Sequence, residues 1–246
     1  MDKREPIVFC WSGGKDSALA LHRLLADERY RVVSLLTTVN ERFARVSMHG
    51  VRLELAQAQA REIGLPLDIV PVSSGTNEEY EQTMAAHLLA YRKQGVSIVA
   101  FGDIFLEDLR RWREERLAQI GMSGLFPLWK LDTRKVIGEF IDLGFASIVC
   151  CVSDAYLDET TLGRTVDWGF IDSLPADVDP CGENGEFHTF ACAGPIFKNR
   201  IAVDVGEIVY QPAVILSPSK DGSAPTSSTR SAKGFWFCDL VPRPGG

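Results

Sequence analysis

Near its N-terminus the chain reads Ile7-Val8-Phe9-Cys10-Trp11-Ser12-Gly13-Gly14-Lys15-Asp16-Ser17. The apolar run at its start predicts a buried strand, the two Gly predict a tight turn, and the apolar spacing over 16–26 predicts a helix. The first turn of a helix offers unpaired backbone N–H groups and the positive end of the helix dipole, and both favour phosphate. The stretch therefore predicts a phosphate-binding loop between a strand and a helix.

Several side chains of this loop suit a phosphate ligand. Ser12 and Ser17 add hydroxyl groups, and Lys15 adds a positive charge. The loop is not a Walker A loop, which needs Gly where this chain has Phe9 and Ser or Thr where it has Asp16. A Gly-rich turn that only caps a helix is the plainer alternative.

Outward from this loop, short apolar runs alternate with helical patterns. We expect strands at 7–11, 32–39, 67–72, 96–101 and 145–152, and helices at 16–26, 51–63, 77–93, 107–120 and 132–143. This alternation predicts parallel βαβ units in an α/β fold with a doubly wound parallel sheet. A helix at 160–174 and strands at 187–192, 201–211 and 235–240 then predict a smaller C-terminal α+β domain.

The chain therefore divides into two expected domains. We place an ATP-binding α/β domain at 1–130 and a C-terminal α+β domain at 131–246. Residues 217–233 are rich in Ser, Pro, Thr and Gly, which predicts a mobile surface loop.

The expected topology also locates the ligand crevice. In a doubly wound sheet, ligands bind at the carboxyl ends of the strands where the strand order reverses, here between the first and fourth strands. Gly102 and Asp103 follow the fourth strand, and Asp103 either helps to bind Mg²⁺ or simply caps the next helix. Thr37 and Thr38 end the second strand and are candidates for contact with adenine or ribose, although strand propensity explains them equally well.

Composition narrows the class of protein. The net charge is −7, so an extended nucleic-acid partner or an anionic membrane surface is unfavoured. The six Cys form no CxxC pair, the N-terminus does not read as a secretory signal, and no apolar stretch is long enough to span a bilayer. We expect a cytoplasmic protein with reduced thiols.

Three further strings are informative: Met48-His49-Gly50-Val51, Phe101-Gly102-Asp103-Ile104, and Asp179-Pro180-Cys181-Gly182-Glu183-Asn184-Gly185-Glu186-Phe187-His188-Thr189-Phe190. Together with the string over 12–17, they resemble the diphthine–ammonia ligase (diphthamide synthetase) family of PP-loop ATP pyrophosphatases. The resemblance covers about 7–197, and its longest string is far more specific than the PP-loop, which many ligases share.

The resemblance implies an adenine nucleotide α hydrolase-like domain with a smaller domain closing over the site. It also implies a reaction in which ATP adenylates a substrate carboxylate, pyrophosphate leaves and ammonia forms the amide, with ATP and Mg²⁺ as cofactors. The implied acceptor is diphthine on elongation factor 2, or a related carboxylate. Free ammonia is the simpler nitrogen source, because no glutaminase domain is visible.

The candidate residues fall into four groups. The nucleotide-binding candidates are Ser12, Gly13, Gly14, Lys15, Asp16, Ser17, Thr37, Thr38, Gly102 and Asp103, of which Asp16 and Asp103 are also the candidate Mg²⁺ ligands. The catalytic candidates are Lys15, Asp16, Glu183, Glu186 and His188, with the two Glu as acceptors of a proton from ammonium. The substrate-binding candidates are His49, Asn184, Gly185 and Thr189.

Plainer alternatives apply to several of these residues. His188 is otherwise a strand histidine, and Cys181 is interpreted as structural, because an acyl-adenylate route needs no thiol. The Arg-rich run over 107–116 is most simply a solvated helix, although one or two of its Arg would be close enough to the crevice to meet phosphate or an acidic substrate.

Two rival functions stay open at this point. One is a PP-loop enzyme that thiolates tRNA, which the missing CxxC and the acidic charge disfavour. The other is a non-catalytic adenine-nucleotide sensor, which the intact Lys15 and Asp16 disfavour. The sequence leaves the oligomeric state open, a homo-oligomer included.

Overall fold

The computed structural model describes residues 2–47, 49–72, 77–212 and 232–243. Its first sheet contains five parallel strands in the order β4-β2-β1-β5-β6. They are β1 (Glu5–Cys10), β2 (Tyr30–Asn40), β4 (Leu67–Val72), β5 (Ile98–Ala100) and β6 (Ser123–Leu125). The two-residue β3 (Arg45–Val46) pairs antiparallel with the end of β2. β2 and β4 lie on one side of β1, whereas β5 and β6 lie on the other, so the strand order reverses at β1.

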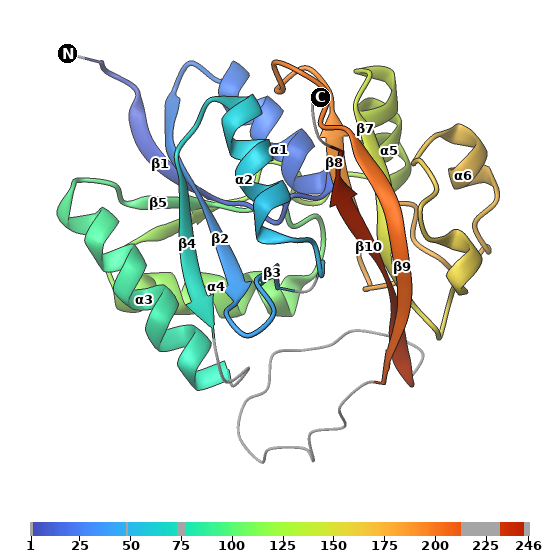
Figure 1. The fold of residues 1–246 in the computed structure, drawn as a ribbon. Helices are drawn as coiled ribbons and strands as arrows, with labels where there is room; N and C mark the ends of the chain where they lie inside the picture. The colour runs from blue at the N-terminus through green and yellow to red at the C-terminus, as the bar shows by residue number, and fades with distance from the viewer. Residues whose placement is uncertain (1, 48, 73–76, 213–231, 244–246) are drawn as a thin grey trace.

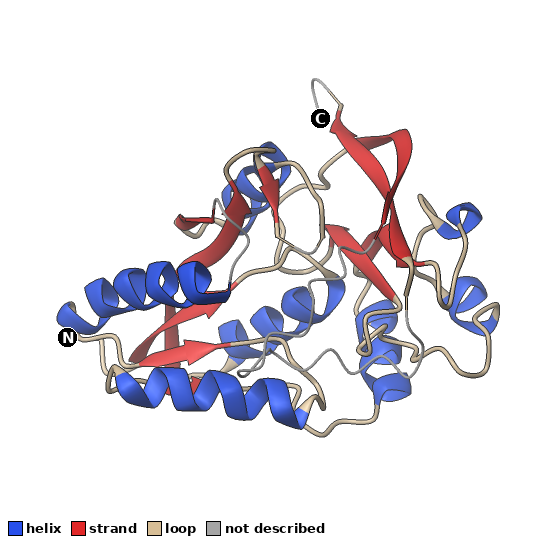
Figure 2. Ribbon diagram, turned by 90° about the horizontal axis from the view of Figure 1, so that it is seen from below, coloured by secondary structure: helices blue, strands red, loops and turns tan. Residues whose placement is uncertain are grey.

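Helices cover both faces of this sheet (Figures 1 and 2). They are α1 (Lys15–Ala26), α2 (Leu53–Ile63), α3 (Asn77–Lys93) and α4 (Glu107–Gln119). Alternation along β1 explains the two faces, since Ile7 and Phe9 pack in one core cluster with α1 and α2, whereas Val8 packs in the other with α3 and α4.

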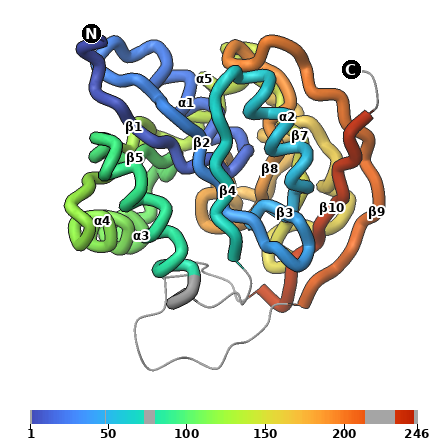
Figure 3. The backbone as a smooth tube through the Cα atoms, turned by 60° about the vertical axis from the view of Figure 1, so that its left-hand side comes forward, coloured from blue at the N-terminus to red at the C-terminus, as the bar shows by residue number. Residues whose placement is uncertain are grey.

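The second sheet is antiparallel, in the order β8-β7-β10-β9. It consists of β7 (Ala146–Ser153), β8 (Phe187–Ala193), β9 (Val203–Pro212) and β10 (Gly234–Pro242). Three helical elements accompany it: α5 (Thr133–Asp142), the 3₁₀ turn η1 (Glu159–Thr161) and α6 (Trp168–Asp172). In Figures 1 and 3, β9 and β10 lie on the opposite side of the molecule from α3 and α4.

One apolar core joins the two sheets. Phe9 and Leu19 from the first part of the chain belong to the same buried cluster as Phe187 and Phe190 from β8. An ion pair reinforces the contact, because Arg52 at the start of α2 binds Asp239 of β10 at 2.6 Å. The second sheet therefore packs directly on the α1–α2 side of the first.

The fold class expected from the sequence is confirmed, with three differences in detail. The strand near 145–152 is β7, which is antiparallel and belongs to the second sheet, because its hydrogen-bonding neighbours are β8 and β10. The outer parallel strand is instead β6, whose Ser-Gly-Leu sequence carries no apolar run. The expected helix at 160–174 is wrong over its middle, where Gly163 has φ +77° and Thr165 bridges to Ile148.

Two predictions on organisation stay predictions. The loop expected at 217–233 lies almost wholly outside the described residues, which resume at 232. The domain boundary between 130 and 131 is retained as a proposal; the last strand of the parallel sheet ends at Leu125, and the first strand of the antiparallel sheet begins at Ala146.

Candidate functional site

The predicted phosphate loop joins the carboxyl end of β1 to the first turn of α1. Gly13 has φ +81°, which only Gly adopts without strain, and Gly14 occupies the N-cap position of the helix without a side chain of its own to cap it. Ser12 replaces that cap in part, because its Oγ accepts the Gly14 N–H at 3.3 Å and lies 3.1 Å from Ser17 Oγ. The residues expected at this loop are therefore gathered at one helix N-terminus, a place that favours anions.

Gln59 of α2 holds the loop from one side. Its Nε2 donates to the carbonyl oxygens of Gly13 at 2.9 Å and Ala191 at 2.7 Å, and its Oε1 accepts the Trp11 indole N–H at 2.9 Å. Gln59 is completely buried. No role was predicted for Gln59 from the sequence, although a Gln on the buried face of an amphipathic helix, four residues after Leu55, was an available signal.

Strand β8 holds the loop from the other side. Thr189 Oγ1 accepts the backbone N–H of Lys15 at 3.0 Å, and the Ala191 N–H donates to the Gly13 carbonyl at 2.8 Å. The string over 179–190 therefore contacts the phosphate loop through Thr189, near the C-terminal end of the string. This contact brings together Lys15 and Thr189, two candidates that are far apart in the chain.

Lys15 is buried, with only 3% of the residue exposed. Its ammonium group donates to Asp16 Oδ2 at 2.8 Å and to the Cys181 carbonyl oxygen, and it lies 5.0 Å from the centroid of the Phe187 ring. Burial, the largest single effect, would lower the pKa of this amine, but the acidic groups around it, Asp16 first and Glu183 among them, together outweigh burial and raise it. Lys15 is therefore a fixed positive charge at the loop.

Glu183 connects the string over 179–190 to the loop after β5. Its Oε1 accepts the backbone N–H groups of Ile104 at 2.8 Å and Phe105 at 3.3 Å. Burial and the neighbouring carboxylate of Asp16 raise the pKa of Glu183 to about 8. A carboxyl group with this pKa exchanges a proton near neutral pH.

Gly102 lets the same loop approach α1 closely. A Cβ at this position would lie 3.0 Å from the backbone nitrogen and Cα of Ser17. The loop after the fourth predicted strand therefore contacts the phosphate loop, as the expected crevice requires.

Glu186 and Asn184 form a turn inside the second part of the chain. Glu186 is completely buried, and its carboxylate accepts N–H groups from Asp179 at 2.9 Å and from the Asn184 backbone at 2.9 Å and side chain at 3.0 Å. Gly185, with φ +84°, supplies the sharp bend between them. These contacts explain Glu186 and Asn184 structurally, and among the described residues neither side chain forms a hydrogen bond with the phosphate loop.

His49 lies beside the loop, since a Cβ on Gly14 would lie 2.7 Å from its Cε1, and His188 packs against His49. The rings of His49 and His188 lie 4.7 Å apart, and His49 Nδ1 lies 3.0 Å from the Thr189 carbonyl oxygen. A carbonyl oxygen only accepts, so Nδ1 carries the proton and Nε2 is an acceptor. Burial lowers the pKa of His49 to about 4 and that of His188 well below its usual value. Both rings are therefore neutral at physiological pH.

Asp103 and the two threonines have simpler surroundings. Asp103 forms an ion pair with Arg113 of α4 at 2.8 Å, so its charge is already balanced. Thr37 is buried with its Oγ1 unpaired among the described residues, and Thr38 uses its backbone carbonyl to accept the Ser47 N–H at 3.0 Å. The unpaired Thr37 hydroxyl is the more suitable of the two for a ligand contact.

Cys181 is also buried, and its thiol lies 3.2 Å from the Thr133 carbonyl oxygen. Burial raises the pKa of this thiol well above its usual value. A thiol in this state is a poor nucleophile, which agrees with the structural interpretation made from the sequence.

The carboxylates around Lys15 allow a test of the expected magnesium site. Within the described residues, no group of three or more His, Cys, Asp or Glu side chains is arranged to hold a metal by itself. Mg²⁺ commonly uses only one or two carboxylates together with phosphate oxygens and water. Asp16, at the loop and with 24% of its side chain exposed, fits such a role better than Asp103.

A Gly-Gly loop followed by Lys15 and Asp16, at the point where a parallel sheet reverses its strand order, defines a PP-loop ATP pyrophosphatase. Residues 6–124 match the family model described as the diphthamide synthase N-terminal domain, and residues 132–216 match the diphthamide synthase C-terminal domain. The chain belongs to the diphthamide synthase family.

Curated relatives agree with this assignment. Diphthine–ammonia ligases from Bos taurus and Homo sapiens are each 27% identical over 231 residues, covering 84% of this chain and 86% of theirs. The Danio rerio diphthine–ammonia ligase is 26% identical over 253 residues, covering 92% of this chain and 94% of its own.

Among solved structures, a U34-tRNA thiolase from Methanococcus maripaludis with its 4Fe–4S cluster matches with a TM-score of 0.35 and 14% identity. The match covers 58% of this chain and 59% of the thiolase. Separately, none of the helices in the described residues is both long and apolar enough to cross a bilayer.

Proposed function

We propose that this chain is an ATP-dependent ligase that converts a carboxylate to an acyl-adenylate with release of pyrophosphate, and then forms the amide with ammonia. Membership of the diphthamide synthase family supports a ligase, and the relatives are diphthine–ammonia ligases. One contact carries the proposal, namely the hydrogen bond from the Lys15 N–H to Thr189 Oγ1, because it joins the nucleotide loop to the family-specific string.

The phosphates of ATP bind at the loop over 12–17. Backbone N–H groups at the start of α1 and the ammonium of Lys15 stabilise the negative charge that develops on the leaving pyrophosphate. Lys15 is pre-positioned for this, because Asp16 and the Cys181 carbonyl hold its ammonium group in place. The unpaired hydroxyl of Thr37, at the end of β2, is the proposed contact for the ribose or adenine.

Magnesium fits beside the loop. Asp16 would hold it together with phosphate oxygens, and when bound it neutralises phosphate charge. Asp103 is the weaker candidate, because its carboxylate is less exposed, at 15% against 24%, and it pairs with Arg113 of α4, whereas Asp16 belongs to the phosphate loop itself.

The second half-reaction needs a proton acceptor for ammonium. Glu183 suits this role better than Glu186, because its pKa lies near 8 whereas both oxygens of Glu186 accept N–H groups of the turn. Glu183 takes one proton from ammonium, and the nitrogen lone pair attacks the acyl carbon. As the C–N bond forms, the bond between the acyl carbon and the AMP oxygen breaks, and the nitrogen loses a further proton to solvent.

The neutral imidazoles of His49 and His188 line the same side of the loop. Among the described residues His49 Nε2 has no hydrogen-bond partner, and in the neutral ring it is an acceptor, so we assign His49 to substrate positioning. Because Thr189 Oγ1 caps Lys15, we assign Thr189 to support of the loop.

The acceptor is diphthine on elongation factor 2, or a related carboxylate, and free ammonia supplies the nitrogen. Purified protein is incubated with ATP, Mg²⁺, ammonium and either diphthine-bearing elongation factor 2 or a panel of acids. We expect pyrophosphate and AMP in equal amounts, both dependent on the acid, with an amide product that incorporates ¹⁵N from ammonium.

Other outcomes separate the rival functions. ATP binding without any pyrophosphate release would favour a nucleotide sensor. Pyrophosphate release that depends on tRNA and a sulfur donor would favour the thiolase reaction. Either result would overturn the ligase proposal.

A further inference from the structure

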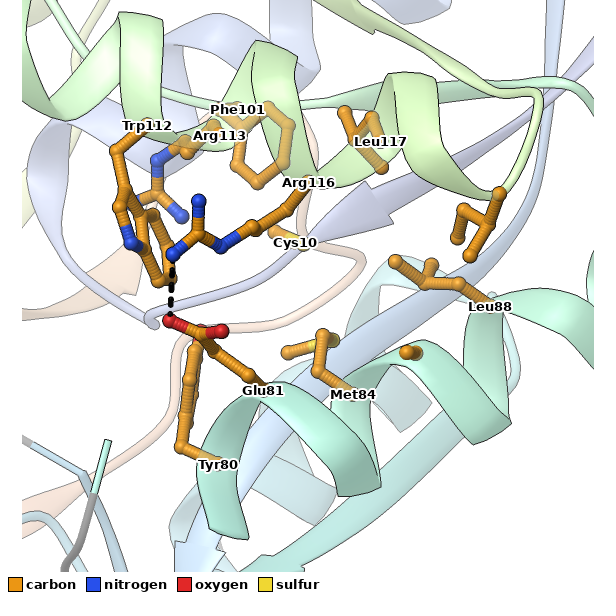
Figure 4. A pocket seen from close by; sticks show the side chains of 12 residues that line it. Cys10, Tyr80, Glu81, Met84, Leu88, Phe101, Trp112, Arg113, Arg116 and Leu117 are labelled. Carbon is orange, nitrogen blue, oxygen red and sulfur yellow. Dashed lines mark hydrogen bonds and ion pairs between the residues drawn. The ribbon is translucent and has the colours of Figure 1, made fainter. Parts of the chain in front are cut away.

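A pocket lies between α3 and α4, on the face of the first sheet opposite α1 and α2. Figure 4 shows its largely apolar and aromatic walls, which we call the α3–α4 pocket and which include Tyr80, Met84, Leu88, Phe101, Trp112 and Leu117. Its cavity volume is about 50 Å³. A buried water needs roughly 10–15 Å³ of such volume, so the closed pocket holds a few waters and a larger ligand must widen it.

The pocket lies beside the phosphate loop. Cys10, which contributes to its lining, is the last residue of β1, and the loop begins immediately after Trp11. Phe101, also in the lining, precedes Gly102, where an added Cβ would lie only 3.0 Å from the backbone of Ser17 in the loop. The strand ends that present the phosphate loop therefore also line this pocket.

Aromatic side chains line the pocket from both helices. The rings of Tyr80 on α3 and Trp112 on α4 have centroids 6.2 Å apart and planes inclined by 28°. Because one ring comes from each helix, movement of α3 relative to α4 changes the space between them. Aromatic rings stack favourably on one another, so a ligand that enters beside these rings gains most if it is itself flat.

Charged groups form the rim. Arg116 binds Glu81 across the two helices at 3.1 Å (Figure 4). About a third of each of these side chains is exposed. A half-exposed ion pair of this kind contributes only about 0–1 kcal/mol, so a ligand can rearrange it at little cost. The Arg116 guanidinium also lies 5.4 Å from the Trp112 ring centroid, where it can meet an acidic group on a ligand held by that ring.

The pocket lining favours one of two possible ligands with a flat ring: the adenine of ATP, or an apolar ring that carries an acidic group. A buried adenine carries an amino group and ring nitrogens that need hydrogen-bond partners. Arg113 and Arg116 form ion pairs with Asp103 and Glu81, yet the Nε atoms of both are buried without a hydrogen-bond partner among the described residues. Nε only donates, so these groups suit a carboxylate and do not serve the amino group of adenine, which needs an acceptor. An apolar ring with its acidic group at the rim fits better.

We propose that the α3–α4 pocket binds a flat aromatic ring of the acceptor, so that the acceptor class is a carboxylic acid bearing an aromatic or heteroaromatic ring. That this acid is the acceptor rests on the proposed ligase function. Binding itself does not depend on turnover.

The test is a calorimetric titration of the whole chain, without ATP, with phenylacetate and indole-3-acetate as probes. Cyclohexylacetate and acetate are the matched non-aromatic acids. We expect the aromatic acids to bind at least tenfold more tightly than either. Equal affinity for cyclohexylacetate would overturn selection for a flat ring, and absence of binding would overturn the pocket assignment.

Two variants locate the binding. Trp112→Ala removes one stacking face, and Ala85→Leu fills the cavity from α3 without removing any ring. Each should raise the Kd of the aromatic acids at least tenfold. Trp168→Ala, at an exposed Trp on α6, is the control and should leave that Kd within twofold of the wild-type value. Unchanged affinity in both pocket variants would overturn the proposal.

ATP titrations of the same variants separate the two sources of a flat ring. We expect the Kd of ATP to stay within twofold. Weaker ATP binding in both Trp112→Ala and Ala85→Leu would show that the pocket takes the nucleotide base, against the proposal. Aromatic-acid binding that depends on Trp112, without acid-dependent pyrophosphate release, would refute the ligase function and leave the pocket assignment intact.

Discussion

The backbone N–H of Lys15 donates to the side-chain hydroxyl of Thr189 at 3.0 Å, across 174 residues of sequence. Gly14, at the N-cap of α1, has no side chain with which to satisfy the first turn of its own helix. Thr189 of β8 therefore supplies a cap that helices usually find within a few residues. The nucleotide loop is complete only when the second sheet is folded against it.

This relationship predicts a stability loss in Thr189→Val. The two side chains have nearly the same shape, but Val leaves the Lys15 N–H buried without a partner, which costs about 1–3 kcal/mol. Urea unfolding should show this loss, and ATP should bind more weakly because the loop is less ordered. Thr189→Ser is the matched control, since it keeps the hydroxyl. Equal stability of the Val and Ser variants would contradict a capping role for Thr189.

Gly13→Ala tests the second support of the loop. Gly13 has φ +81°, and an added Cβ would lie 2.7 Å from Gln59 Oε1. Left-handed backbone costs Ala about 1–2 kcal/mol, and the displaced Gln59 would lose hydrogen bonds of about 1 kcal/mol each. We expect Gly13→Ala to be at least about 2 kcal/mol less stable than wild type by urea unfolding.

Gly95→Ala is the control for that variant. Gly95 has φ +87°, but no atom lies within 4 Å of an added Cβ. It should show the backbone cost alone, so the difference between the two variants measures the contact with Gln59. Equal losses of stability in Gly13→Ala and Gly95→Ala would mean that Gln59 moves away from the added Cβ at no cost in free energy.

The first strand, the loop and α1 could be predicted because their signals are local. The apolar run of β1, the two Gly and the helical spacing after Lys15 are contiguous, and no distant residue changes their meaning. The strand at 145–152 was also identified, but its partners were not. An apolar run does not specify whether its neighbours are parallel or antiparallel, and β7 pairs with β8 and β10 from later in the chain.

Prediction of the site from the sequence has the same limit, because it depends on signals that are local in the chain. The residues of the loop over 12–17 could be predicted to lie together, because they are neighbours in sequence. Glu183 and Glu186 could not be distinguished, because both lie in one string of charged and small residues. Their difference is tertiary: Glu183 reaches Ile104 across the crevice, whereas Glu186 turns inward to its own loop. Gln59 was missed because its partners, two backbone carbonyls and the Trp11 indole, come from β1, the loop after it and β8, which only the tertiary fold brings to α2.

Lys15→Ala should abolish most ATP turnover. The Lys15 ammonium is the buried positive charge at the loop, and its loss removes stabilisation of the leaving pyrophosphate. We expect pyrophosphate release to fall at least about 100-fold, which corresponds to about 2.7 kcal/mol of transition-state stabilisation. Thermal unfolding would show that the variant is folded, and Lys135→Ala, at an exposed Lys on α5, should retain full activity. Undiminished turnover in a folded Lys15→Ala protein would place the phosphates elsewhere.

Glu183→Gln separates the electrostatic role of this residue from its hydrogen bonds. Gln keeps an oxygen that accepts the Ile104 N–H but has no titratable proton. In the wild type, burial and Asp16 raise the pKa of Glu183 from 4.5 to about 8. Between these values the folded protein holds a proton that the unfolded chain has released, so the contribution of Glu183 to the free energy of unfolding falls as pH rises and levels off above about 8.

Without ligand, the stability of Glu183→Gln relative to wild type should therefore increase across that pH window, as measured by urea unfolding at each pH. Glu41→Gln, at an exposed Glu, is the control for a simple change of charge. In turnover, Glu183→Gln should impair amide formation from ammonium more than from hydroxylamine, because hydroxylamine is already neutral near pH 8 and needs no proton acceptor. Equal impairment with both amines would assign Glu183 to positioning of the loop instead of proton transfer.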